Sequence, residues 1–259
     1  MYRPHAWVVN IGNELLIGRI TNTNATVIAR ELMLRGVIVK RIVVVGDYLD
    51  DIATSVREAV GYADIVVTTG GLGPTDDDIT MEAVAAAINA PLVLNKAALE
   101  MVEAFYRKRG LQLTRERLKM AYLPLGAEPV PNPVGAAPGA YINYSGSHIV
   151  VLPGVPSEME AMLKIALNRL AHILPELCVA EEGITIEGVP ESSLAPLLRK
   201  ASKLCSDCYI KSHPKGHEVD NPIIDVKVMA SAPDCDTARS KVLTVLGYLK
   251  KLIQGGDSD

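Results

Sequence analysis

Glycines and aspartates gather in one stretch of the chain, where an apolar run gives way to a predicted helix. The run Asp64–Thr68 is typical of a buried strand, and Gly70, Gly71, Gly73, Thr75 and the triplet Asp76, Asp77 and Asp78 follow it. Glycines let a backbone approach a ligand closely, and the N–H groups at a helix start attract anions. Carboxylates beside an anion repel it unless a divalent cation lies between them. The stretch therefore indicates a phosphate-bearing ligand held partly through metal. The alternative is a solvated loop with an Asp helix cap.

Polar residues also follow two earlier predicted strands, Ala6–Ile11 and Val37–Val45. Glu14 stands among apolar residues just after Gly12, where a carboxylate is costly unless it is exposed or paired. Asp47 could bind a metal, orient water or form a turn with its own backbone. Asn24 could bind a ligand, although helix capping would also explain an asparagine there. These residues are expected to contribute to the same ligand site.

Two rigid turns rich in proline and glycine complete the candidate set. The first, Asn132–Gly139, could form the wall of a pocket with Gly135, Pro138 and Gly139. The second begins with Leu152, Pro153 and Gly154 at a strand end and leads into a helix, so it presents free N–H groups. Ordinary turn chemistry is the alternative for both segments.

Strand patterns alternate with helix patterns through the first two thirds of the chain. Helices are expected over 24–35, 51–62, 79–89, 96–109, 114–122 and 156–174, a loop over 124–138, and a hairpin from the strands 140–144 and 148–152. Repeated strand–helix units predict an α/β fold with three layers, in which helices cover both faces of a mostly parallel sheet. Ligands in such folds bind at the carboxyl ends of the strands, where the candidate residues fall.

A domain boundary is expected near Pro175. Residues 1–174 would form the site domain, and residues 255–259 a frayed tail. Residues 175–254 predict a smaller α+β domain in which a strand, helix, strand, strand and helix follow in order. That order is compatible with a nucleic-acid-binding KH-like shape, but no G-x-x-G clamp is present. Packing or subunit contacts are the alternative role.

Composition narrows the function classes. The 259 residues are 49% hydrophobic, with a formal net charge of −4, which argues against a nucleic-acid partner. No apolar run approaches the roughly 18 residues that a membrane helix needs, and the N-terminus lacks a signal peptide, so a cytoplasmic protein is expected. Dinucleotide-binding, P-loop and serine-hydrolase motifs are missing from the sequence. Cys205 and Cys208 have the spacing of metal ligands or a redox pair, but without a second such pair they are expected to be small residues at a helix–strand junction.

These motifs resemble, in order, the molybdopterin-binding-like (MoCF biosynthesis) domain of the competence-damage-inducible (CinA) family. The segments that carry the resemblance are Ile11–Leu16, Val45–Asp47, Thr69–Thr80, Asn132–Gly139 and Leu152–Glu158. Gly188-Val-Pro-Glu-Ser looks like the start of the family's small middle domain, so the resemblance extends over nearly the whole chain. Longer members add an amidohydrolase domain, which is not expected in this chain.

The resemblance implies a site and an activity. It assigns Asp47 and Asp78 to two acidic catalytic positions and, through the match to molybdopterin adenylyltransferases, Thr80 to the end of the glycine motif. Leu72 and Pro74 favour the CinA branch, which is associated with metal-dependent pyrophosphatase activity on ADP-ribose.

The motifs and the resemblance together lead to three hypotheses about function. The first is a homo-oligomeric hydrolase of nucleotide diphosphates in which Asp47, Asp76, Asp77 and Asp78 hold Mg²⁺, Mn²⁺ or Co²⁺. The second is a pterin-binding or pterin-adenylating protein. The third is a nucleotide- or pterin-binding module without turnover.

Overall fold

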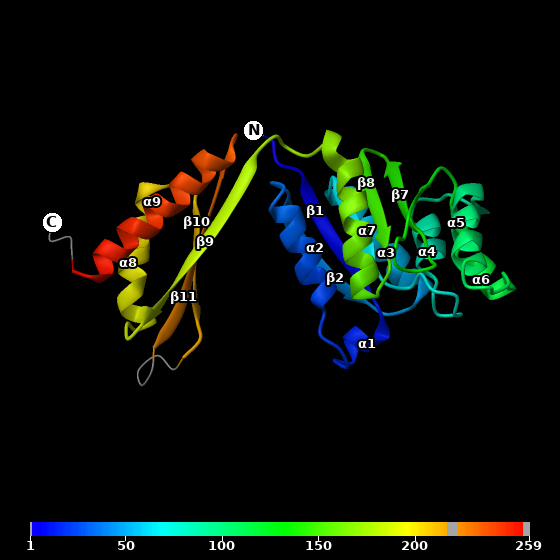
Figure 1. The fold of residues 1–259 in the computed structure, drawn as a ribbon, viewed down its shortest axis with the longest axis horizontal. Helices are drawn as coiled ribbons and strands as arrows, with labels where there is room; N and C mark the ends of the chain where they lie inside the picture. Colours follow the sequence, from blue (N-terminus) through cyan, green and yellow to red (C-terminus); the bar gives the residue numbers. More distant parts are fainter. Residues whose placement is uncertain (1, 217–221, 256–259) are drawn as a thin grey trace. The chain divides into compact units, whose positions relative to one another are not determined.

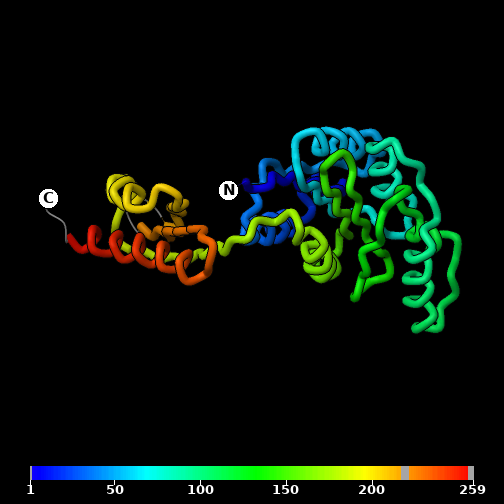
Figure 2. The backbone as a smooth tube through the Cα atoms, turned by 90° about the horizontal axis from the view of Figure 1, so that it is seen from above, coloured from blue at the N-terminus to red at the C-terminus, as the bar shows by residue number. Residues whose placement is uncertain are grey.

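The structure is a computed structural model that describes residues 2–216 and 222–255. The chain divides into two compact units, one built from residues up to Pro175 and the other mainly from Glu176 onward. The path of the backbone through each unit can be followed in Figure 2. Within the described residues no helix is long and apolar enough to cross a membrane.

The first unit alternates strands and helices, as Figure 1 shows. Its elements are β1 (His5–Ile11), α1 (Asn13–Leu16), α2 (Thr23–Met33), β2 (Ile38–Val45), α3 (Leu49–Tyr62), β3 (Ile65–Thr69), α4 (Thr80–Ala87), β4 (Leu92–Leu94), α5 (Lys96–Arg107), α6 (Arg115–Lys119), β5 (Tyr122–Pro124), β6 (Glu128–Val130), β7 (Gly139–Tyr144), β8 (Ser147–Leu152), α7 (Pro156–Arg169) and the 3₁₀ turn η1 (Leu170–His172).

The central sheet has the strand order β2-β1-β3-β8-β7-β6. The first four of these strands run parallel to one another, whereas β7 pairs antiparallel with β8 and β6 with β7. The mostly parallel sheet and the predicted hairpin are thus confirmed. Because β1, β3 and β8 are adjacent and parallel, the loops that follow them all leave from one edge of the sheet.

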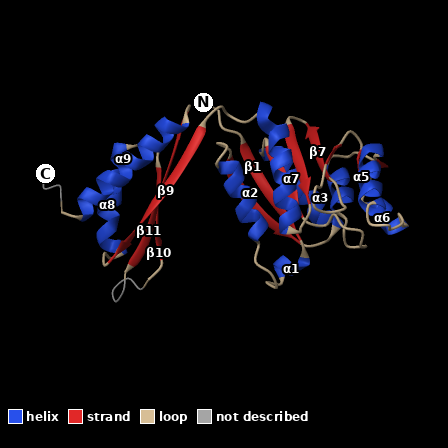
Figure 3. Cartoon of the chain, viewed as in Figure 1, coloured by secondary structure: helices blue, strands red, loops and turns tan. Residues whose placement is uncertain are grey.

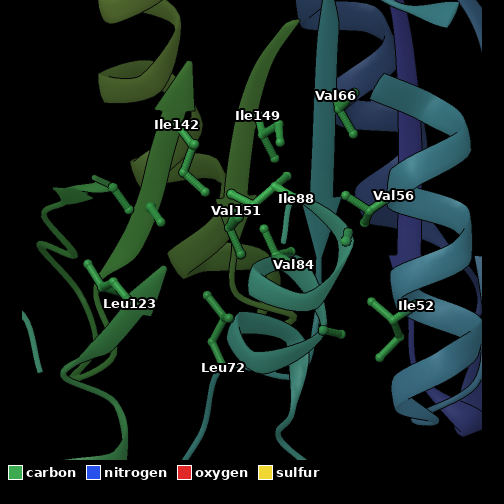
Figure 4. Packing of buried hydrophobic residues seen from close by; sticks show 14 of the residues in the cluster. Ile52, Val56, Val66, Leu72, Val84, Ile88, Leu123, Ile142, Ile149 and Val151 are labelled. Atoms are coloured by element: carbon green, nitrogen blue, oxygen red, sulfur yellow. The ribbon is translucent and has the colours of Figure 1, made fainter. Parts of the chain in front are cut away.

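Alternation along the strands divides the core into two layers. In β1, Trp7 and Val9 pack into the cluster that includes Ile52 and Val56 of α3, while Ala6 and Val8 face the other cluster. The first cluster also contains Val84 of α4 and Val151 of β8, and Figure 4 shows these side chains pointing toward one another. The second cluster lies between the sheet and helices α2 and α7. Helices on both faces of the sheet confirm the three-layer prediction.

The Pro-rich stretch was the least accurately predicted part of this unit. The predicted helix over 114–122 is shorter, because α6 ends at Lys119 and Tyr122 begins β5. The predicted loop over 124–138 contains β6, which pairs with β7, and β5 pairs with β4. These strands are three residues long, too short for a side-chain period to reveal, and only their partners stabilise them.

The second unit contains β9 (Cys178–Glu187), α8 (Glu191–Leu204), β10 (Tyr209–Pro214), β11 (Ile223–Ala232) and α9 (Cys235–Ile253). This order matches the expected strand, helix, strand, strand and helix. The strands form an antiparallel sheet in the order β10-β11-β9, and α8 and α9 pack together against it (Figure 3). Helix α9 begins where Asp234 caps it, by accepting a hydrogen bond from Thr237 N. The tail predicted over 255–259 lies outside the described residues except for Gly255.

Candidate functional site

The glycine loop begins at Gly70, directly after β3. Gly70 has φ +116°, and a Cβ there would lie 2.1 Å from Ile11 O, so only glycine fits between the ends of β3 and β1. Thr80, the first residue of α4, closes the loop by donating from Oγ1 to Gly70 O at 2.9 Å and from its N–H to Gly71 O at 3.2 Å. The predicted strand–loop–helix arrangement is therefore held at both ends.

Asp77 and Asp78 of the acidic triplet fold back on their own loop through Thr75. Thr75 N donates to Asp78 Oδ2 at 2.9 Å, and the Thr75 hydroxyl lies 2.6 Å from that atom and 2.5 Å from Asp77 Oδ1. The hydroxyl has one proton and donates it to one carboxylate at a time. Hydrogen bonding from Thr75 lowers the pKa of Asp77, and the charge of Lys119 adds to this. Lys119 Nζ also donates to Thr75 O at 2.5 Å, so this cation is held beside the acidic loop.

A cavity of about 410 Å³ opens over this loop, and we call it the loop cavity. Its polar lining includes Gly71, Gly73, Asp78 and the Pro153–Gly154 turn after β8. The remaining lining is largely apolar and comes from Leu72, Tyr106, Met120, Ala136, Ala137 and Val155, with Glu158 at the start of α7. The cavity therefore joins loops from two neighbouring strand ends to residues of the Pro-rich segment.

A second, smaller cavity of about 70 Å³ lies at the end of β1, and we call it the amide cavity. Asn10, Glu14, Asn24, Thr69 and Gly154 are among its lining residues. Asn24 Nδ2 donates to Thr69 Oγ1 at 2.9 Å and to Gly154 O at 2.8 Å, and Thr69 Oγ1 donates to Pro153 O at 2.8 Å. Asn24 is thus buried within a hydrogen-bond chain that joins α2, β3 and the turn after β8.

Residues after β1 and β2 interact with one another. Asp47 Oδ2 accepts a hydrogen bond from Asn13 N at 2.8 Å, at the start of α1. A Cβ on Gly12, whose φ is +155°, would lie 2.4 Å from Glu14 Oε1, so the Glu14 carboxylate is folded against Gly12. Asp47 therefore supports the short helix that carries Glu14.

The three predicted residues of the Pro-rich turn, Gly135, Pro138 and Gly139, lie in surroundings that differ from one to the next. Gly135 lies under the Glu158 carboxylate, which also accepts from Asn132 Nδ2 at 2.7 Å. Pro138 lines a pocket of about 40 Å³ beside Gly71, Gly73 and Asp78. Gly139 is buried in β7, where a Cβ would lie 2.3 Å from Val151 O, so its glycine is explained by strand packing.

The four carboxylates proposed for metal binding do not converge on one point. In residues 2–216 and 222–255, the one group of three candidate side chains with ligand atoms within 4.8 Å of each other is Cys205, Asp207 and Cys208. Asp76 lines a separate cavity of about 550 Å³ with Arg115 and Lys119. The oxygen donors of Asp77 and Asp78 suit a hard cation such as Mg²⁺, but they need further ligands.

The cysteines form two disulfides, which were not predicted from the sequence. Cys178 is bonded to Cys235, and Cys205 to Cys208. The sulfurs of Cys205 and Cys208 are therefore not free thiolates in this structure, although Cys205 lines a cavity of about 410 Å³ with Asp207 and Lys241.

The family described as "Probable molybdopterin binding domain" matches residues 7–172. The chain belongs to this family. A protein of Aeropyrum pernix is 51% identical over 252 residues, covering 97% of this chain and 94% of that protein. A protein of Metallosphaera sedula is 44% identical over 257 residues, covering 98% and 97%.

The fold of the first unit is supported by similarity to a solved structure. CinA from Thermoplasma acidophilum, described as a protein of unknown function, is 44% identical and has a TM-score of 0.62. The match covers 65% of this chain and 98% of that one. The expected resemblance to the CinA family and its molybdopterin-binding-like fold is confirmed.

Several residues that line the amide cavity or the loop cavity were not predicted as site residues from the sequence. Asn10 was predicted only as part of a buried strand, and Thr69 only as the first residue of the segment Thr69–Thr80. Tyr106 and Met120 lie in or next to helices that carry no motif. A polar residue near the end of an otherwise apolar strand was the available signal for Asn10, because such a side chain is costly to bury without partners. Tyr106 and Met120 had no such signal, since only the packing of α5 and α6 brings them to the loop.

Proposed function

We propose that the chain binds a phosphorylated small molecule of pterin type in the loop cavity. The observation that carries this proposal is the lining of the cavity, in which the glycine loop and the Pro153–Gly154 turn face apolar walls that include Leu72 and Met120. Ligand sites commonly combine mostly apolar walls with a few placed polar groups. The loop N–H groups suit a phosphate, and the apolar walls suit a flat ring. Membership of a family described as molybdopterin binding supports the pterin class.

Calorimetry with a pterin monophosphate tests this proposal. Binding is expected for the phosphorylated pterin and weaker binding for the same pterin without phosphate, because the loop would lose its anion. Equal affinity for both would contradict a phosphate role for the loop. A lack of binding by either compound would contradict the proposal as a whole.

A second function is favoured by the position of Asp78. Its carboxylate lines the loop cavity, with Asp77 beside it across the Thr75 hydroxyl. We propose as the alternative a metal-dependent hydrolase that splits ADP-ribose with water into AMP and ribose 5-phosphate. A bound divalent cation would neutralise charge on phosphate oxygens and lower the pKa of water. Asp77 and Asp78 would hold it, with substrate oxygens supplying the missing ligands.

AMP release from ADP-ribose measures this alternative directly. Activity is expected with Mg²⁺, Mn²⁺ or Co²⁺ and is expected to be lost in chelator. If the chain binds the pterin but releases no AMP with any of these metals, the binding function would be supported and the hydrolase function contradicted. AMP release that persists in chelator would reject the metal role.

A further inference from the structure

Two asparagines that line the amide cavity have buried amide oxygens that accept no hydrogen bond from any described residue. They are Asn10 Oδ1 and Asn24 Oδ1, on side chains that are 0% and 9% exposed. Their orientation is determined by their partners. Asn10 Nδ2 lies 3.0 Å from Val43 O and Asn24 Nδ2 lies 2.8 Å from Gly154 O, and a carbonyl oxygen can only accept. Each amide must therefore present its nitrogen to the protein and keep its oxygen for another donor.

Both asparagines belong to the same side of the sheet. Asn10 follows Ala6 and Val8 in the alternation of β1, and these face the cluster packed by α2, the helix that carries Asn24. The Glu14 carboxylate lines the same cavity. A carboxylate and two unpaired acceptors disfavour a phosphate there and favour a group that carries only N–H or O–H donors.

Gly154 lines both the amide cavity and the loop cavity. A ligand can therefore place its phosphate at the glycine loop while another part of it reaches the asparagines past Gly154. The amide cavity, at about 70 Å³, has room for the edge of a ring but not for a whole bicyclic ring. The complementary edge is one with adjacent N–H donors.

We propose that Asn10, Asn24 and Glu14 recognise the edge formed by the 2-amino group and the neighbouring ring N–H of a pterin. This inference rests on the proposed pterin binding and names the part of the ligand that determines specificity. Replacing the amino group by an oxo group would put an acceptor against unpaired acceptors. Sites built to hydrogen-bond a substrate group reject analogues that lack it.

Matched ligand pairs test this inference on the full chain. Calorimetry would compare a pterin monophosphate with the corresponding lumazine monophosphate, in which oxygen replaces the 2-amino group. GMP and XMP make the same exchange on a purine and form the second pair. The chain is expected to prefer the pterin over the lumazine by about 10–100-fold. Equal affinity within the pterin pair would overturn the edge recognition while leaving pterin binding intact.

The second pair separates this inference from the proposed function. A preference for GMP over XMP without any pterin binding would support the edge recognition and overturn the pterin proposal. No binding of any of the four ligands would overturn both.

Two variants assign the preference to these residues. Glu14→Gln keeps the side-chain size and removes the charge, and Asn10→Leu removes one unpaired oxygen at similar volume. Both are expected to reduce the pterin-to-lumazine preference to about threefold or less. Glu160→Gln, an exposed carboxylate on α7, is the matched control and should keep the full preference. An unchanged preference in Glu14→Gln would overturn the assignment even if Asn10→Leu failed to fold.

Discussion

Asp78 is the residue at which phosphate binding and metal binding make opposite demands. Its carboxylate lines the loop cavity and accepts two contacts from Thr75, which keep it turned toward the loop. A phosphate bound to the loop N–H groups would be repelled by this charge and attracted if a cation lay between them. The sign of the effect of Asp78 on ligand affinity therefore reports whether a cation takes part.

Asp78→Asn is expected to change ligand binding in opposite directions with and without metal. In Mg²⁺ the variant should bind a pterin monophosphate about tenfold more weakly and hydrolyse ADP-ribose, if the wild type does, about 100-fold more slowly. In chelator it should bind the phosphate ligand at least as tightly as the wild type, because a negative charge is gone. Asp51→Asn, an exposed change on α3, is the control and should alter neither measurement. An identical response of the two variants to Mg²⁺ would contradict the presence of a cation at the site.

His148 makes the first unit sensitive to mild acid. It is 6% exposed in β8, its Nδ1 lies 2.7 Å from Tyr141 Oη, and its ring meets His172. Burial lowers the pKa of His148, with a further decrease from His172 and an opposing increase from Asp64. The folded protein thus binds a proton less readily than the unfolded chain, whose histidine pKa is about 6.5. Stability is therefore full above about pH 6.5 and falls as the pH decreases toward the lowered pKa.

His148→Gln is expected to weaken this pH dependence. Gln can still accept a hydrogen bond from Tyr141 but does not titrate. Between about pH 7.5 and 5.5, the wild-type melting temperature should fall by a few degrees more than that of the variant. Thermal melts followed by circular dichroism measure the difference, with His213→Gln in β10 as the control. Parallel curves for wild type and His148→Gln would assign the acid sensitivity to other groups.

Among the elements, β9 and α9 are joined covalently. Cys178 begins β9, Cys235 begins α9, and the bonded residues are 57 positions apart in the chain. Cys205 and Cys208 are 3 positions apart and only close the turn between α8 and β10. A crosslink restricts the unfolded chain more when it closes a longer loop. The two disulfides should therefore differ in their contributions to stability.

The double variant Cys178→Ser with Cys235→Ser is expected to lose more stability than Cys205→Ser with Cys208→Ser. Loop entropy predicts about 4 kcal/mol for the 57-residue separation and about 2 kcal/mol for the 3-residue one. Urea unfolding of both double variants measures the order. Ligand binding should remain close to wild type in the Cys205–Cys208 variant, because the candidate site residues lie in the other unit. A larger loss for the shorter loop would show that the reduced turn rearranges.

For the molecule as a whole, the candidate site and its core belong to one unit. Both hydrophobic clusters around the central sheet are built from residues before Pro175, as are both cavities at its carboxyl edge. The second unit has a separate core around Val226, Val228 and Leu249. Each unit therefore has the apolar packing that independent folding requires.

A chain that ends at Pro175 is expected to keep ligand binding. Circular dichroism would first establish that it folds, and calorimetry with a pterin monophosphate and with ADP-ribose would then compare it with the full chain. Affinities within about threefold of the full chain are expected, because every proposed contact is retained. A folded but non-binding fragment would show that residues after Pro175 complete the site. Homo-oligomerisation stays a prediction, and sedimentation of the two chains would show which unit mediates it.

Long periodic segments and local motifs could be read from the sequence alone. The sequence patterns predicted helices over 191–204 and 235–253, and α8 and α9 have these bounds. The strand–helix repeats that begin with β1, β2 and β3 predicted the parallel sheet, and the glycine motif predicted the loop after β3. Such signals are local, because side-chain period and backbone freedom act within a few residues.

Other features depended on partners distant in sequence. Strands β4, β5 and β6 exist through pairing that no three-residue pattern can show, and the cysteine pairs depend on which helix starts meet which strands. Asn10 became a site candidate only when the fold placed it in the cavity that Asn24 also lines. Asp77 and Asp78 proved to be turned onto Thr75 rather than gathered with Asp47. Residue types indicate which chemistry is available, whereas the direction of each side chain is determined by tertiary contacts, because those contacts decide which hydrogen bonds are satisfied and which are left for a ligand.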